Sequence, residues 1–151
     1  MSKIILHTLI DAPIETVFNN CRNIDLHIKS ANQTNEKAIA GKTSGLIEKD
    51  ETVTWKGKHF GFYITHQSII SEMENPYYFV DEQLKGMFKI FKHSHFLKTV
   101  NNTTVMIDCI NYEVSFGILG KIFDQLVLKK HLTQFLVQRN NFIKEVSISQ
   151  H

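Results

Sequence analysis

One stretch decides the fold: residues 91–112, which read FKHSHFLKTVNNTTVMIDCINY. Two β-rich runs flank Asn101-Asn102, and asparagine tolerates the positive φ angles that a two-residue hairpin turn requires. Counting outward from this turn predicts four cross-strand pairs, whose side chains share one face of the hairpin: Leu97 with Met106, His95 with Asp108, His93 with Ile110, and Phe91 with Tyr112. The segment therefore predicts an antiparallel hairpin that carries an imidazole-carboxylate cluster among apolar residues.

Which face of this hairpin points into the protein is not decided by alternation alone. The opposite face carries Phe96, Ile107 and Cys109, but Lys92 and Lys98 interrupt it. The face with Phe91, Leu97, Met106, Ile110 and Tyr112 is more continuously apolar, so we expect it to be concave.

The hairpin belongs to a longer β-rich region, residues 37–115, in which turn residues separate strands as in an antiparallel meander. Gly57-Lys58 suits another two-residue turn, which would set Trp55 opposite Phe60 and Val53 opposite Phe62. Before this region come a strand near 3–10, a helix beginning at Pro13, and a short helix within 23–30.

After the meander, residues 116–146 contain no proline and predict one long helix. Its apolar residues form two stripes that are out of phase, which indicates a bend near Lys129 or two halves that bury different sides. The stripes are Leu119, Ile122, Phe123 and Leu126, then Leu128, Leu132, Phe135, Ile143 and Val146. The order of elements predicts an α+β helix-grip fold over residues 1–151, with about seven antiparallel strands around the C-terminal helix.

Composition limits the function classes. The 151 residues are 42% hydrophobic and 21% charged with a formal net charge of +2, which indicates one globular domain. No concentrated basic stripe is visible, so nucleic acid is not expected as a partner. No apolar run of about 20 residues predicts a membrane span. Cys21 and Cys109 lack metal or redox spacing, and with no leader evident we expect a cytoplasmic protein.

Several strings resemble the START/Bet v 1-like (SRPBCC) superfamily, in particular its bacterial ligand-binding and polyketide cyclase-like branch. They include Ala12-Pro13 with Val17-Phe18, Val53-Thr54-Trp55, His59-Phe60-Gly61, Phe79-Val80-Asp81-Glu82, and Phe116-Gly117-Ile118-Leu119-Gly120. The resemblance spans nearly the whole chain and implies a sheet curled around the last helix, with an apolar cavity between them. It implies binding of a hydrophobic, lipid-like or polyketide-like molecule and, in a minority of members, catalysis.

His95 and Asp108 are the candidate catalytic residues. A carboxylate behind an imidazole fixes its tautomer and raises its basicity, as cyclase or dehydratase chemistry on a polyketide-like substrate would need. The alternative is a non-catalytic cross-strand pair, which we favour. His93 and His95 also point to one side as metal ligands do, yet no further ligand has a supporting spacing, so neither metal nor cofactor is expected.

The sequence thus favours a binding or carrier protein over a cyclase- or dehydratase-type enzyme, which stays the alternative, and we expect a ligand to enter near the start of the long helix. The expected ligand-binding residues are Trp55, Phe60, Phe62, Glu82, Phe91, His93, His95, Met106, Asp108, Tyr112, Leu119 and Phe123. His66 is a further polar candidate, whereas His7, His27 and His131 are expected on the solvated surface. The sequence leaves a homodimer open.

Overall fold

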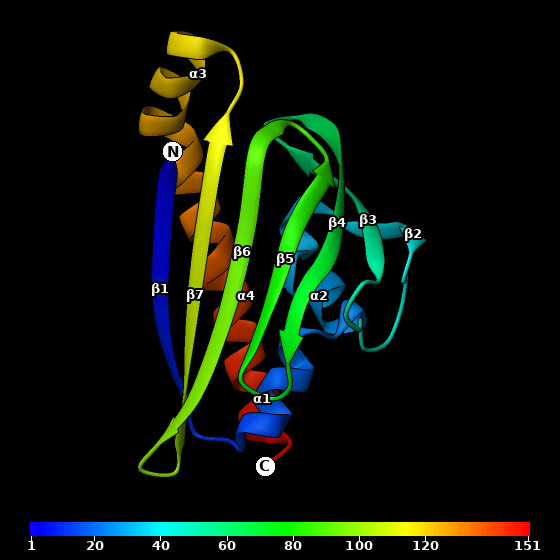
Figure 1. Cartoon of the computed structure of the whole chain (residues 1–151), viewed down its shortest axis with the longest axis vertical. Coiled ribbons are helices and arrows are strands. Elements are labelled where there is room, and N and C mark those ends of the chain that lie inside the picture. The colour runs from blue at the N-terminus through cyan, green and yellow to red at the C-terminus, as the bar shows by residue number, and fades with distance from the viewer.

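The computed structural model describes residues 1–151, and Figure 1 shows the course of the chain from β1 to the C-terminal helix. The elements are β1 Ser2–Ile10, α1 Ile14–Cys21, α2 Ile24–Ser30, a 3₁₀ turn Asn32–Thr34, β2 Lys37–Gly41, β3 Thr52–His59, β4 Phe62–Glu74, β5 Tyr78–Lys85, β6 Phe88–Val100, β7 Thr103–Val114, α3 Gly117–Phe123, a π-helical segment Asp124–Leu128, and α4 Lys129–Ser149. The two short helices after β1 confirm the sequence prediction.

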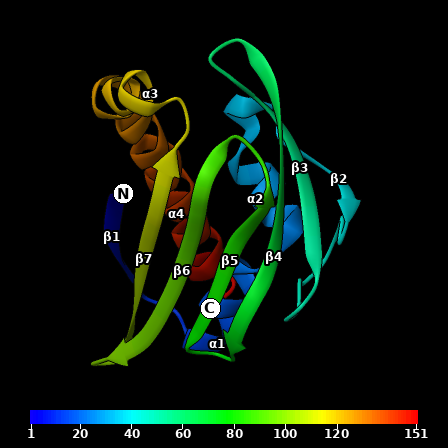
Figure 2. The same ribbon diagram turned by 45° about the horizontal axis from the view of Figure 1, so that its top comes forward.

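The seven strands form a single antiparallel sheet in the order β1-β7-β6-β5-β4-β3-β2. Figures 1 and 2 show that this sheet curves, with α4 running along one face and α1 and α2 beside it. Helix α4 packs against β1, α1 and α2. The predicted helix-grip architecture is therefore confirmed. No helix combines the length and apolar character that a bilayer crossing would need.

The β6–β7 hairpin has the predicted register. Leu97 lies opposite Met106, His95 opposite Asp108, His93 opposite Ile110, and Phe91 opposite Tyr112. Asn101 and Asn102 both adopt positive φ, at 49° and 62°, as a type I′ turn requires. Met106, Asp108, Ile110 and Tyr112 are all buried, so the expected face is concave.

The β3–β4 hairpin corrects the sequence prediction. Its turn lies at Phe60-Gly61, where both residues have positive φ, at 52° and 81°, and not at Gly57-Lys58. Trp55 consequently pairs with His66 rather than with Phe60, and Val53 pairs with Ser68 rather than with Phe62. Gly57 is a buried residue within β3, where an added Cβ would lie 3.3 Å from His59 Nε2.

The C-terminal helix contains the predicted change of phase. The π-helical segment Asp124–Leu128 separates α3 from α4 and ends immediately before Lys129. Leu119 and Leu126, of the first stripe, are exposed, whereas Leu128 and Ile143, of the second, are buried. Each π turn takes one residue more than an α turn, so the two halves present different sides to the sheet.

Two apolar clusters pack beneath the sheet. The larger joins α1 and the middle strands and includes Phe18, Trp55 and Phe79, together with Ile143 from α4. The smaller joins β1, β7 and the first turns of α4 through Ile4, Tyr112 and Leu136 among others. Fully buried apolar side chains of this kind contribute roughly 1.5–3 kcal/mol each and fix α4 against the sheet.

Candidate functional site

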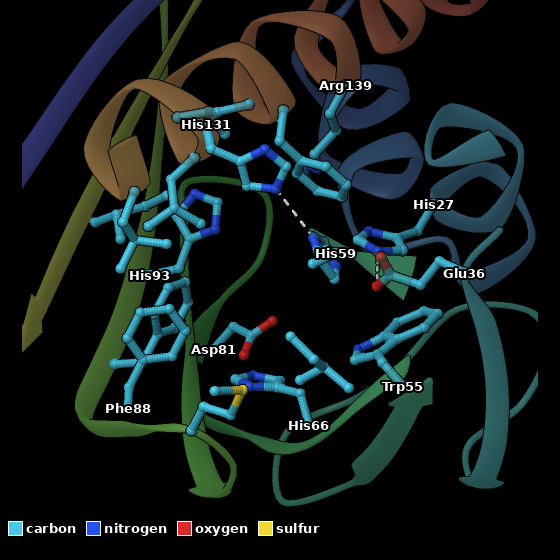
Figure 3. A pocket seen from close by; sticks show the side chains of 18 of the residues that line it. His27, Glu36, Trp55, His59, His66, Asp81, Phe88, His93, His131 and Arg139 are labelled. Carbon is cyan, nitrogen blue, oxygen red and sulfur yellow. Dashed lines mark hydrogen bonds and ion pairs between the residues drawn. The ribbon is translucent and has the colours of Figure 1, made fainter. Parts of the chain in front are cut away.

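A pocket of about 660 Å³ lies between the concave face of the sheet, α2 and the α3–α4 region. Figure 3 shows side chains from several elements pointing into it. Twenty of its 33 lining residues are hydrophobic, among them Trp55, Phe60, Phe91, Phe123 and Phe135. Cavities of this size and lining accommodate small organic molecules.

Imidazoles supply much of the polar lining. Six of the eight histidines of the chain line this one pocket: His27, His59, His66, His93, His95 and His131. Each neutral imidazole both donates and accepts a hydrogen bond, so together they offer several orienting contacts on an otherwise apolar wall. The concentration of one residue type within a single pocket is the most distinctive feature of the site.

His93 and His95 form the deepest polar group. His93 Nε2 donates to Asp108 Oδ1 over 2.8 Å, and His95 Nδ1 lies 3.0 Å from the same oxygen but out of line for a hydrogen bond. The two imidazole centroids are 3.8 Å apart, and the His95 ring stacks on Phe79 at 4.0 Å. Burial, followed by the neighbouring His93, holds the pKa of His95 well below its usual range, so His95 is neutral at pH 7.

Asp108 has a partner on each of its two oxygens. Asn140 Nδ2 donates to Oδ2 over 2.7 Å, and Arg139 Nη1 lies 3.6 Å from Oδ1. Burial alone would raise the pKa of Asp108, but the hydrogen bond from His93 and the adjacent imidazole of His95 hold that pKa well below its usual range. Asp108 is thus a buried carboxylate that ties β7 to α4.

His93, His95 and Asp108 form the one group with the geometry of metal ligands, because their nitrogen and oxygen atoms lie within 4.8 Å of one another. Yet His93 already donates to the oxygen that a cation would need, and the Arg139 guanidinium supplies a positive charge beside it. A buried ion pair satisfied in this way fits a structural and orienting role better than a metal centre.

A second polar group lies on the α2 side. His27 Nε2 donates to Glu36 Oε1 over 3.0 Å, and the His27 ring packs on Trp55 with centroids 4.2 Å apart (Figure 3). Burial would raise the pKa of Glu36, but the hydrogen bond and the charge of His27 outweigh it and lower that pKa. Trp55, the only tryptophan, is therefore held with its ring against a polar pair.

The third group spans the pocket. His59 Nδ1, at the end of β3, lies 3.0 Å from His131 Nε2 on α4, and His66 lies on the opposite wall with Asp81 (Figure 3). Burial is the largest cause that lowers the pKa of His59, His66 and His131. Asp81 Oδ1 is buried and has no hydrogen-bond partner, so this carboxylate retains an unused acceptor.

The expected ligand-binding residues divide into two sets. Seven lie in the pocket lining: Trp55, Phe60, Phe62, Phe91, His93, His95 and Phe123. Five do not: Met106 is in the apolar core, Asp108 is beneath the histidines, Tyr112 donates to Asp124, Glu82 lies 3.7 Å from Lys92 on the other face, and Leu119 is exposed. That the first set binds a ligand stays a prediction.

Two histidines correct the sequence prediction. His27 and His131 were expected on the solvated surface, but both are half-buried and line the pocket. The sequence does contain an indication that His131 faces inward, because it lies four residues before the apolar Phe135 and therefore on the same side of the helix. Glu36 and Asp81 carry no comparable signal, since their positions depend on how distant strands pair.

Comparison with solved structures decides the architecture. The protein TTHA0849 from Thermus thermophilus superposes with a TM-score of 0.71 at 15% identity, covering 97% of this chain and 99% of that one. A START superfamily protein from Mycobacterium smegmatis gives 0.72 at 9% identity, covering 95% and 98%. This chain has the START/Bet v 1-like fold. Ginseng major latex-like protein 151 from Panax ginseng shares it, with a TM-score of 0.69, 15% identity and 97% of each chain covered.

At identities of 15% and below, the likeness extends to the arrangement of strands and helices and not to individual site residues. No protein-family model matches the sequence, and no curated protein sequence does. The function therefore has to be inferred from the pocket itself.

Proposed function

We propose that this protein binds a hydrophobic small molecule in the pocket between the sheet and α4, and carries or sequesters it without chemical change. The observation that carries this proposal is the pocket of about 660 Å³ whose wall is mainly aromatic and aliphatic. Removing an apolar ligand from water onto such a wall stabilises the complex by about 25 cal/mol for each Å² of apolar surface buried.

The polar groups give the ligand an orientation. Imidazoles project from several sides, and Asp81 offers an acceptor with no partner in the protein. A ligand with an apolar, lipid-like or polyketide-like body would pack against the apolar wall, and one or more hydroxyl groups on it would donate hydrogen bonds to Asp81 or to an imidazole. A purely hydrocarbon ligand would leave Asp81 unpaired.

Trp55 makes the proposal directly testable, because it is the only tryptophan and lines the pocket. Titration with the neutral apolar probe N-phenyl-1-naphthylamine should quench Trp55 emission by energy transfer, with saturation at one probe per chain. Native mass spectrometry of the purified protein should show an additional mass where a cellular ligand is retained. Absence of saturable quenching would contradict the proposal.

Variants on α4 place the binding in this pocket. Leu132 lines the pocket, so Leu132→Phe should reduce the space for the probe and weaken binding about tenfold. Val137 lies on the same helix, is exposed and does not line the pocket, so Val137→Phe should leave the affinity unchanged. Equal loss in both variants would show that the probe binds elsewhere.

A second candidate function is proton transfer on a polyketide-like substrate by His95 with Asp108. The supporting observation is that both His93 and His95 line the pocket while Asp108 lies beneath them. Its test is the conversion of a linear polyketide-like ketone, followed by mass spectrometry, with wild type and His95→Gln. Turnover that disappears in His95→Gln while probe binding persists would favour the enzyme hypothesis over the carrier.

A further inference from the structure

An exposed apolar surface surrounds one end of the pocket. It is formed by three segments: 56–63 at the β3–β4 turn, 84–90 at the β5–β6 turn, and 116–133 through α3 into α4. Figures 1 and 2 place the two turns and α3 at the same end of the molecule, away from the β6–β7 turn. Each segment also supplies pocket-lining residues, for example Phe60, Met87 and Phe116, so the surface and the pocket are continuous.

The apolar side chains of this surface are unusually large and open to water. Phe116, Ile118 and Leu119 are 80%, 76% and 77% exposed, and Phe62 on the β3–β4 turn is 74% exposed. The Phe60 and Phe123 rings, 5.5 Å apart, connect the β3–β4 turn to α3. Single exposed apolar residues are ordinary, but a group on adjoining segments marks an interaction surface.

The exposed charges on the same three segments are all positive. The segments contain seven lysines and one acidic residue, Asp124, which is buried and bonded to Tyr112. Lys89 pairs with Glu113, and the other six lysines have no ion pair. The three segments therefore carry a net charge of +6, whereas the rest of the chain carries −4, because the whole chain has +2.

We propose that this end of the protein docks on an anionic lipid bilayer, with α3 and the two turns inserted at the level of the headgroups. Apolar side chains rimmed by lysines suit that interface, since the former enter the acyl boundary and the latter neutralise lipid phosphates. The pocket then opens against the membrane, so an apolar ligand passes between bilayer and pocket without crossing water.

A second copy of the chain fits this surface less well. A two-fold dimer through α3 would bring two faces of +6 together, and like charges at an interface oppose association. The charge favours a partner with dense negative charge, and the apolar residues favour one with an acyl interior. A bilayer containing anionic lipid has both, and docking on it does not depend on whether the pocket is occupied.

Flotation with large unilamellar vesicles tests the docking. At low ionic strength the protein should float with vesicles of phosphatidylcholine and phosphatidylglycerol in a 7:3 ratio and remain behind with pure phosphatidylcholine. Reversal of two lysines in Lys129→Glu/Lys130→Glu should lower partitioning at least about tenfold, because each basic residue near the surface adds to the attraction of the protein to the anionic leaflet. Lys49→Glu/Lys98→Glu makes the same charge change outside the three segments and should have a smaller effect.

The apolar part is tested separately. Ile118→Ser/Leu119→Ser should also lower partitioning at least about tenfold, whereas Ile5→Ser/Leu9→Ser, on the exposed side of β1, should not. Neither α3 residue lines the pocket, so probe quenching of Trp55 should persist in that variant and keeps this test distinct from the test of ligand binding.

Two results would overturn the inference. One is equal partitioning to neutral and anionic vesicles, unchanged by the α3 variant. The other is a wild-type protein that does not float with the anionic vesicles. If sedimentation velocity then shows a stable dimer that Ile118→Ser/Leu119→Ser dissociates, the surface belongs to self-association.

Discussion

His59 Nδ1 lies 3.0 Å from His131 Nε2, so an imidazole at the end of β3 is joined to one on α4 across the pocket. A single proton lies between the two nitrogens when the rings are neutral, and two protonated rings could not keep this contact. Burial lowers the pKa of both histidines, which is the direction that preserves it.

Stability should therefore depend on pH in a defined window. The folded-state pKa values of His59, His66, His95 and His131 lie below those of the unfolded chain, so the unfolded chain binds more protons once the pH falls below about 6.5. The free energy of unfolding should decrease from pH 7.5 to pH 5.5, as measured by urea denaturation. Glu36 and Asp108, with lowered pKa values, contribute their losses only at more acidic pH.

His131→Gln should reduce this pH dependence, because it removes one of the groups that gain a proton on unfolding. His7, which is exposed, provides the matched control, and His7→Gln should leave the dependence as in the wild type. If the free energy of unfolding changed equally with pH in the wild type and in His131→Gln, His131 would not be one of the groups that gain a proton on unfolding.

Asp108→Asn should destabilise the protein by about 3 kcal/mol, because it leaves the buried Arg139 guanidinium without its counter-charge. Urea denaturation at pH 7 measures the loss. Combining it with Arg139→Met should recover part of that loss, since no uncompensated charge then remains buried. Glu145→Gln, at an exposed position on α4, should change the free energy of unfolding by less than about 0.5 kcal/mol.

Tyr112→Phe should cost about 1–3 kcal/mol, because Tyr112 Oη donates to Asp124 Oδ1 over 2.5 Å, and Asp124 would keep only Ser2 as a side-chain donor. Thermal denaturation compares it with Tyr77→Phe, which removes an exposed hydroxyl and should be neutral. A loss no greater than in Tyr77→Phe would show that the bond between Tyr112 and the π-helical segment contributes nothing.

Cys21 should resist thiol reagents in the folded protein. Burial raises the pKa of Cys21 to about 12, so the reactive thiolate does not form at neutral pH. The Cys21 sulfur also lies 3.2 Å from Met106 Sδ in the core, where a reagent cannot reach it. Peptide mass spectrometry after treatment with iodoacetamide should find modification at Cys109 only, and at both cysteines in guanidinium chloride. Modification of Cys21 under native conditions would show that α1 detaches.

The sequence predicted those parts of the fold that local chemistry determines. Asn101-Asn102 has the side chains that a type I′ turn favours, and the register of β6–β7 follows from it without error. Phe60-Gly61 adopts the same turn with a phenylalanine at positive φ, which local preference does not predict. The neighbouring Gly57 was the better local candidate, and the error in register came from that choice.

The polar half of the site was only partly predictable for a related reason. His93, His95 and Asp108 come from a single hairpin, so their proximity follows from one register. His27, Glu36, His59, Asp81 and His131 come from five elements or connections, and only the packing of the curved sheet with α2 and α4 brings them around one pocket. The distances between these segments depend on how the whole chain packs, and no short stretch of sequence predicts them.

The π-helical segment Asp124–Leu128 has a further consequence for how such a protein can change. Because successive helical residues are separated by about 100° around the axis, one residue removed from this segment would rotate all of α3 relative to α4 by about that angle. The direction in which α3 presents its apolar side therefore depends on the number of residues in this segment as well as on their identity. A one-residue deletion or insertion within Asp124–Leu128 would therefore change the side that α3 presents to solvent while the sequence of α4 stays the same.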